Sequence, residues 1–68
     1  MPYDKTTELP DSVQSNLPEG AQKIYMKAFN SAWDEYADQD DREAVAHKVA
    51  WSAVKGSYEK RDGRWVEK

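Results

Sequence analysis

The sequence predicts a mainly helical (α+β) fold: three helices with a small two-stranded sheet formed near the N- and C-termini. Three segments, near residues 10–15, 18–36 and 43–60, carry apolar residues at the three-and-four spacing of amphipathic helices. Both ends of the chain carry short segments typical of strands. With 68 residues and no cysteine, the chain is expected to form a single domain over residues 1–68, with most of its core supplied by aromatic side chains.

The N-terminal part is expected to form an edge strand and then a short helix. Pro2 fixes φ and Tyr3 favours extended backbone, which predicts a strand over Pro2–Asp4. Pro10 stands at a first-turn position and a second proline limits the end, so a helix is predicted over residues 10–15. Its apolar residues recur every four positions, at Leu9, Val13 and Leu17.

Residues 18–36 give the strongest helix signal in the chain. A proline and a glutamate open the segment, which favours a helix start. Lys23, Lys27, Ser31 and Asp34 fall on the polar side. We interpret the opposite, apolar stripe as packing in the core rather than as a ligand groove. The stripe consists of Ala21, Tyr25, Ala28, Phe29, Ala32, Trp33 and Tyr36.

Residues 43–60 are predicted to form the central helix, because two of its sides are apolar. A helix of this kind is normally buried between other elements. Trp51 is therefore expected to lie in the core. One apolar side consists of Val45, Ala46, Val49, Ala50 and Ala53, and the other of His47, Trp51, Val54 and Tyr58.

The end of this helix has two interpretations, because Gly56 costs about 1 kcal/mol in a helix and is also a common stop. In the favoured one, the helix continues to about Lys60, and a last strand over residues 64–66 pairs with the segment around Tyr3. In the alternative, Asp62-Gly63 turns residues 57–60 back onto residues 64–67 as a hairpin.

The motifs of common catalytic sites are missing from the sequence. His47 is the only histidine, cysteine is absent, and the chain has neither a glycine-rich phosphate loop nor a nucleophile elbow. His47 is expected to be a partly buried histidine with its hydrogen bonds satisfied, and the protein is expected not to be an enzyme. No apolar run reaches membrane-spanning length and no signal peptide is recognised, so the cytoplasm is the expected location.

Acidic residues are concentrated in the first part of the chain. Residues 1–43 hold ten acids and four bases, whereas residues 44–68 hold three acids and six bases. Asp38, Asp40 and Asp41 are a candidate for a weak Ca²⁺ or Mg²⁺ site, because hard cations bind carboxylate oxygens. The alternative is a solvated linker in which Asp40 or Asp41 caps the next helix. No other cofactor is expected.

The basic residues near the C-terminus are a candidate nucleic-acid site, and the alternative is a solvated end of the chain. Binding to phosphates would neutralise charge and release counterions. The net charge of −3 weighs against this interpretation. The candidate residues are Lys55, Lys60, Arg61, Arg64 and Lys68.

Nearly the whole chain resembles the ChaB family of small bacterial proteins. The likeness is carried by the stretches MPY, LPDSVQSNLPEGAQKIYMKAFNSAWDEY, AHKVAWSAVKGSYEK and GRWVEK. Its most specific parts are the two Leu-Pro steps, Leu9-Pro10 and Leu17-Pro18, together with Ala28-Phe29-Asn30 and the Trp33, His47 and Trp51 positions.

The resemblance implies three helices with a small sheet near the termini. For function, it implies a small regulatory protein that binds a protein partner, with a membrane cation/proton antiporter as that partner and nucleic acid as a less favoured one. It supplies no active-site motif to carry over. A monomer is expected. Asn30 lies at the edge of the apolar stripe and is expected to bond a neighbouring backbone segment.

Overall fold

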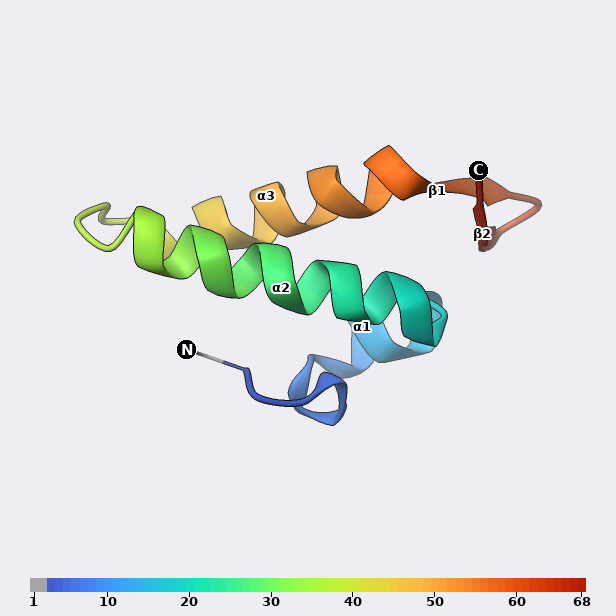
Figure 1. Cartoon of the computed structure of the whole chain (residues 1–68), viewed down its shortest axis with the longest axis horizontal. Coiled ribbons are helices and arrows are strands. Elements are labelled where there is room, and N and C mark those ends of the chain that lie inside the picture. The colour runs from blue at the N-terminus through green and yellow to red at the C-terminus, as the bar shows by residue number, and fades with distance from the viewer. Residues whose placement is uncertain (1–2) are drawn as a thin grey trace.

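The computed structural model describes residues 3–68, and it confirms a mainly helical fold with three helices and a small sheet (Figure 1). The molecule is elongated, with extents of 38 × 21 × 15 Å. The elements, in chain order, are the 3₁₀ turn η1 (Thr6–Glu8), helices α1 (Asp11–Asn16), α2 (Glu19–Glu35) and α3 (Arg42–Ser57), and strands β1 (Tyr58–Arg61) and β2 (Arg64–Glu67).

The two Leu-Pro steps set the starts of α1 and α2, as the sequence predicts. Pro10 and Pro18 are the N-cap residues, and their carbonyls accept the first helical hydrogen bonds. Each step is completed by a glutamine five residues after its leucine. Gln14 Nε2 donates to the Leu9 carbonyl over 2.6 Å, and Gln22 Nε2 donates to the Leu17 carbonyl over 2.8 Å. These bonds satisfy backbone carbonyls at both corners of the chain.

The central helix is α2, so the prediction that residues 43–60 form it is wrong. Figure 1 shows α2 between α3 on one side and the segment of η1 and α1 on the other. Only one line of α3 is fully buried, and Trp51 is half-buried. The N-terminal segment packs on α2, which leaves the second apolar side of α3 partly open. The buried line of α3 consists of Ala46, Ala50 and Val54.

The sheet is the local hairpin, and the favoured pairing with the segment around Tyr3 is wrong. Helix α3 passes through Gly56 and ends at Ser57 rather than Lys60. Strands β1 and β2 pair antiparallel, from Tyr58↔Glu67 to Arg61↔Arg64. Asp62 and Gly63 both have positive φ, of 50° and 81°, which matches the twist of a two-residue hairpin turn.

The strand predicted over Pro2–Asp4 is not formed in its described part. Pro2 lies outside the described residues, and Tyr3 and Asp4 belong to no strand. The backbone of Tyr3 instead bonds the side chain of Asn30. The expectation that Asn30 bonds a neighbouring backbone segment is therefore confirmed.

One hydrophobic cluster joins all three helices and the hairpin. Tyr25 is at its centre with 0% exposure. Its ring lies 6.1 Å from Phe29 and 5.4 Å from Trp51, centroid to centroid. Trp51 also contacts Trp65 of β2 at 5.7 Å, which ties the hairpin to α3.

Candidate functional site

The loop between α2 and α3 forms an acidic end of the molecule, which we call the acidic pole (residues 34–43). Figure 1 places this loop at the opposite end of the long axis from the β1–β2 hairpin. The charge difference along the sequence thus becomes a charge difference along the molecule. The acidic pole carries Asp34, Glu35, Asp38, Asp40, Asp41 and Glu43, with Arg42 as its one base.

Arg42 holds the pole onto α2. Its Nε donates to the Trp33 carbonyl over 2.7 Å, and its guanidinium lies 4.0 Å from the centroid of the Trp33 ring. The Trp33 ring also stacks on Phe29 at 6.0 Å. The hydrogen bond and the cation–π contact together hold Arg42, near the end of the pole, against Trp33, the residue that precedes the pole.

Two of the three aspartates proposed as a cation site border one hollow. Asp40 and Asp41 border a hollow of about 430 Å³ with Glu43, Ala44 and His47, and Asp38 does not line it. Asp41 is the N-cap residue of α3, but its side chain makes no cap hydrogen bond. Among residues 3–68, no three acidic or histidine side chains are grouped closely enough to hold a metal ion.

His47 completes the hydrogen bonding of a core residue. Its Nδ1 pairs with the hydroxyl of the fully buried Tyr25. The imidazole also packs edge-on against the rings of Tyr25 and Phe29. His47 is exposed rather than partly buried, yet this contact gives it a structural role, because a buried hydroxyl without a partner is costly.

The basic residues proposed for nucleic acid gather at the other end of the molecule, on more than one face. Arg61 and Arg64 are cross-strand partners, whereas Lys60 pairs with Trp65 on the opposite face of the hairpin. Arg61 forms an ion pair of 3.4 Å with Glu59. Lys55 lies in the last turn of α3, and the Lys68 amide bonds the Ser57 carbonyl.

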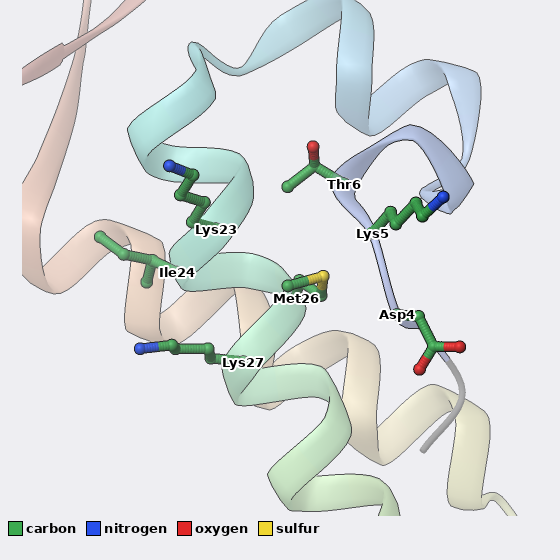
Figure 2. A pocket seen from close by; sticks show the side chains of 7 residues that line it. All are labelled: Asp4, Lys5, Thr6, Lys23, Ile24, Met26 and Lys27. Atoms are coloured by element: carbon green, nitrogen blue, oxygen red, sulfur yellow. The ribbon is translucent and has the colours of Figure 1, made fainter.

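A further hollow, of about 450 Å³, lies between α2 and the N-terminal segment (Figure 2). We call it the lysine-rimmed hollow. Sequence reasoning does not find it, because Lys23 and Lys27 fall on the polar side of their helix and residues 4–6 are distant from them in the chain. Its lining residues are Asp4, Lys5, Thr6, Lys23, Ile24, Met26 and Lys27.

Tyr58 of β1 is 7% exposed, and its hydroxyl lies beside Gly20 at the start of α2. Its hydroxyl donates to Glu67 Oε1 over 3.4 Å. Burial raises the pKa of the Tyr58 phenol, and the Glu67 carboxylate adds to the rise. The phenol thus favours its neutral form in the folded state.

Within residues 3–68, none of the helices has the length and apolar character needed to cross a membrane.

Comparison with known proteins identifies relatives that match the chain over its whole length. The family described as ChaB matches residues 9–68. A protein of Escherichia coli (strain K12) named "Putative cation transport regulator ChaB" is 52% identical over 100% of this chain and 99% of its own. A protein of Shigella flexneri with the same name has the same identity and coverage.

A solved structure has the same fold. The NMR solution structure of a cation transport regulator of that name superposes with a TM-score of 0.87 and 51% identity, covering 98% of this chain and 99% of the other. The arrangement of helices and hairpin described above is therefore shared with an experimentally determined relative.

Proposed function

The chain belongs to the ChaB family, and we propose that it is a small non-catalytic module that regulates a cation/proton antiporter by binding to it. The observation that carries this proposal is the full-length identity of 52% to a protein named as a cation transport regulator. The fold adds support, because its one histidine is engaged with a buried tyrosine rather than with a reactive side chain.

The acidic pole is the surface that we propose for contact with the antiporter. It lies at one end of an elongated molecule, its acidic residues are exposed, and Arg42 is occupied by Trp33. A concentrated charge of one sign attracts a basic patch on a partner and speeds the encounter. We place the module in the cytoplasm as a monomer, with weak Ca²⁺ or Mg²⁺ binding at Asp40 and Asp41 as a subsidiary property.

Binding to the purified antiporter in lipid nanodiscs tests the proposal. The parent chain should bind, and Asp40→Asn with Asp41→Asn should weaken binding by about tenfold, the effect of losing roughly 1.4 kcal/mol of charge attraction. The matched control is Asp11→Asn with Glu19→Gln, which removes two charges far from the pole and should leave binding unchanged. No binding by the folded parent chain would refute the proposal.

Nucleic-acid binding is a second candidate, favoured by the adjacent side chains of Arg61 and Arg64 on one face of the hairpin. Glu59 pairs with Arg61 and lowers the free positive charge there. If this function holds, titration with duplex DNA at low salt should shift amides of residues 55–68, and the affinity should fall steeply as salt rises. A spectrum that stays unchanged at high DNA concentration would exclude it.

A further inference from the structure

The lysine-rimmed hollow has an apolar floor and a basic rim. Figure 2 shows Met26 projecting from α2 toward the Asp4–Thr6 segment, with Lys23 and Lys27 on either side of Ile24. Lys5 adds a third ammonium group from the facing segment. The volume of about 450 Å³ lies within the range of roughly 300 to 1,000 Å³ found for ligand sites.

The charge of this rim is opposite to that of the whole molecule. The chain carries a net charge of −3, yet the hollow has three lysines against one acid, Asp4. Within residues 3–68 none of these lysines forms an ion pair. Each of the three ammonium groups is thus available to an acidic ligand.

Hydrogen bonds hold the start of the N-terminal wall of the hollow in place. The Asn30 side chain bonds both polar backbone groups of Tyr3. The Asp4 amide donates to Glu8 Oε1 over 2.7 Å. A wall that is already ordered loses little conformational entropy when a ligand binds, which favours affinity.

We propose that the lysine-rimmed hollow binds an acidic peptide segment of the partner protein, with one apolar side chain on the floor and carboxylates on the rim. Met26 receives the apolar side chain, because it projects toward the Asp4–Thr6 segment, and methionine adapts its shape to different partners. Lys5, Lys23 and Lys27 pair with the flanking carboxylates. This inference rests on the proposed function in one respect, namely that the chain acts by binding a protein.

The shape and charge of the surroundings favour a peptide over other anions. A second hollow of about 330 Å³ shares Asp4, Met26 and Lys27 with the first and extends to Asp34. The two together form a groove along α2 that is basic at one end and acidic at the other. A short peptide can confine its carboxylates to the lysine end of this groove, whereas an anionic membrane or a nucleic acid presents negative charge along the whole groove and is repelled at Asp34.

A synthetic peptide provides the direct test. The probe is acetyl-Glu-Glu-Leu-Glu-Glu-amide, and its two controls replace the glutamates by lysine or the leucine by serine. The probe should shift backbone amides of residues 4–6 and 23–27, less so as salt rises, and both controls should give much smaller shifts. Shifts confined to other residues, equal binding of the lysine peptide, or binding to anionic lipid vesicles in place of the peptide would overturn the inference.

Charge reversal in the rim gives the matched variants. Lys23→Glu with Lys27→Glu should weaken binding of the probe by about tenfold or more, which corresponds to roughly 1.4 kcal/mol. The control, Lys48→Glu with Lys55→Glu, makes the same charge change at exposed positions of α3 and should have a much smaller effect. Equal weakening by the two pairs would show general charge attraction and refute a site in the hollow.

Binding of the parent chain and of the Lys23→Glu, Lys27→Glu variant to the antiporter distinguishes a failure of this inference from a failure of the proposed function. If the parent chain binds the antiporter and the Lys23→Glu, Lys27→Glu variant binds it equally well, the hollow does not take part in docking and the inference fails, although the regulatory function and the contact through the acidic pole stand. If the parent chain does not bind the antiporter, the proposed function fails, and the peptide titration alone then decides whether the hollow is an acidic-peptide site.

Discussion

The side chain of Asn30 holds both backbone polar groups of Tyr3. The Tyr3 amide donates to Asn30 Oδ1 over 3.2 Å, and Asn30 Nδ2 donates to the Tyr3 carbonyl over 2.8 Å. Asn30 is the one buried polar side chain of residues 3–68, at 5% exposure. The Tyr3 ring packs on Phe29 at 5.0 Å. A single amide therefore fastens the N-terminal segment to α2.

Asn30→Ala should release this segment. The substitution removes two hydrogen bonds at a buried position, so the free energy of unfolding should fall by about 1 to 3 kcal/mol, measured by urea denaturation. The matched control is Asn16→Ala. Asn16 donates to the Ser12 carbonyl at an exposed site, and its loss should change stability by about 0.5 kcal/mol or less. Similar losses for both variants would contradict a fastening role for Asn30.

The helix starts could be predicted from sequence, because they depend on local chemistry. Proline at the N-cap and an acid in the first turn mark where α1 and α2 begin. The same region also contains a short internal repeat. Leu-Pro with a glutamine five residues after the leucine occurs twice, eight residues apart. Gln14 and Gln22 make equivalent hydrogen bonds to the carbonyls of Leu9 and Leu17. The repeat is visible in the sequence, although its meaning depends on the corner geometry.

The favoured pairing of the last strand with the segment around Tyr3 and the prediction of the central helix are wrong for different reasons, whereas the alternative hairpin is confirmed. Asp62-Gly63 is a strong local turn signal, and closing a two-residue loop costs less entropy than pairing the two ends of the chain. The local hairpin is therefore the better prediction on physical grounds. The choice between α2 and α3 as central helix is not local. It depends on which helix the N-terminal segment covers, and the bonds of Asn30 to Tyr3 are among the contacts that hold this segment on α2.

Gly20→Ala tests the contact between the start of α2 and the hairpin. A Cβ atom at residue 20 would collide with the hydroxyl oxygen of Tyr58. The buried Tyr58 ring has little room to move, so this substitution should destabilise the protein by about 1 to 2 kcal/mol, measured by thermal or urea unfolding. In a Tyr58→Phe background the oxygen is absent, and the same substitution should cost at least about 1 kcal/mol less.

Gly56→Ala is the control for this experiment. Gly56 lies within α3, and a Cβ atom added there would meet no neighbouring atom within 4 Å. Alanine at this position should stabilise the protein by up to about 1 kcal/mol through its helix propensity. If Gly20→Ala stabilises the protein to the same extent, the contact with Tyr58 does not constrain the start of α2.

Trp51→Ala should cost less than the removal of a core residue. Trp51 is half-buried, whereas Tyr25 is completely buried. We expect Trp51→Ala to lower the free energy of unfolding by about 2 kcal/mol and Tyr25→Ala by about 3 to 5 kcal/mol, each measured by chemical denaturation. A Trp51→Ala chain without a cooperative transition would show that Trp51 contributes more to the core than its burial indicates.

The acidic pole should respond weakly to divalent cations. Binding should be weak, because few carboxylates are available to replace the ion's water shell. Ca²⁺ or Mg²⁺ should therefore shift the amides of residues 34–43 only at about millimolar concentration. Asp40→Asn with Asp41→Asn should abolish the shifts. Asp38→Asn should leave most of them, since Asp38 does not line the hollow. Equal shifts with sodium at the same ionic strength would indicate screening in place of a site.

The candidate surfaces could be predicted from sequence only in part. The charge of the acidic pole is visible in residues 34–43, since neighbouring residues in a loop remain neighbours in space. The lysine-rimmed hollow could not be predicted. It lies between Lys5 on one side and Lys23 and Lys27 on the other, and this arrangement depends on how the N-terminal segment lies on α2.

Cation/proton exchange by the antiporter tests the regulatory function most directly. The assay uses everted membrane vesicles from cells that contain the antiporter and lack this chain, and purified chain is added over a range of concentrations. We predict a saturable change in the exchange rate, reduced by Asp40→Asn with Asp41→Asn and retained by Asp11→Asn with Glu19→Gln. An exchange rate that stays the same at every concentration of the folded parent chain would contradict the account.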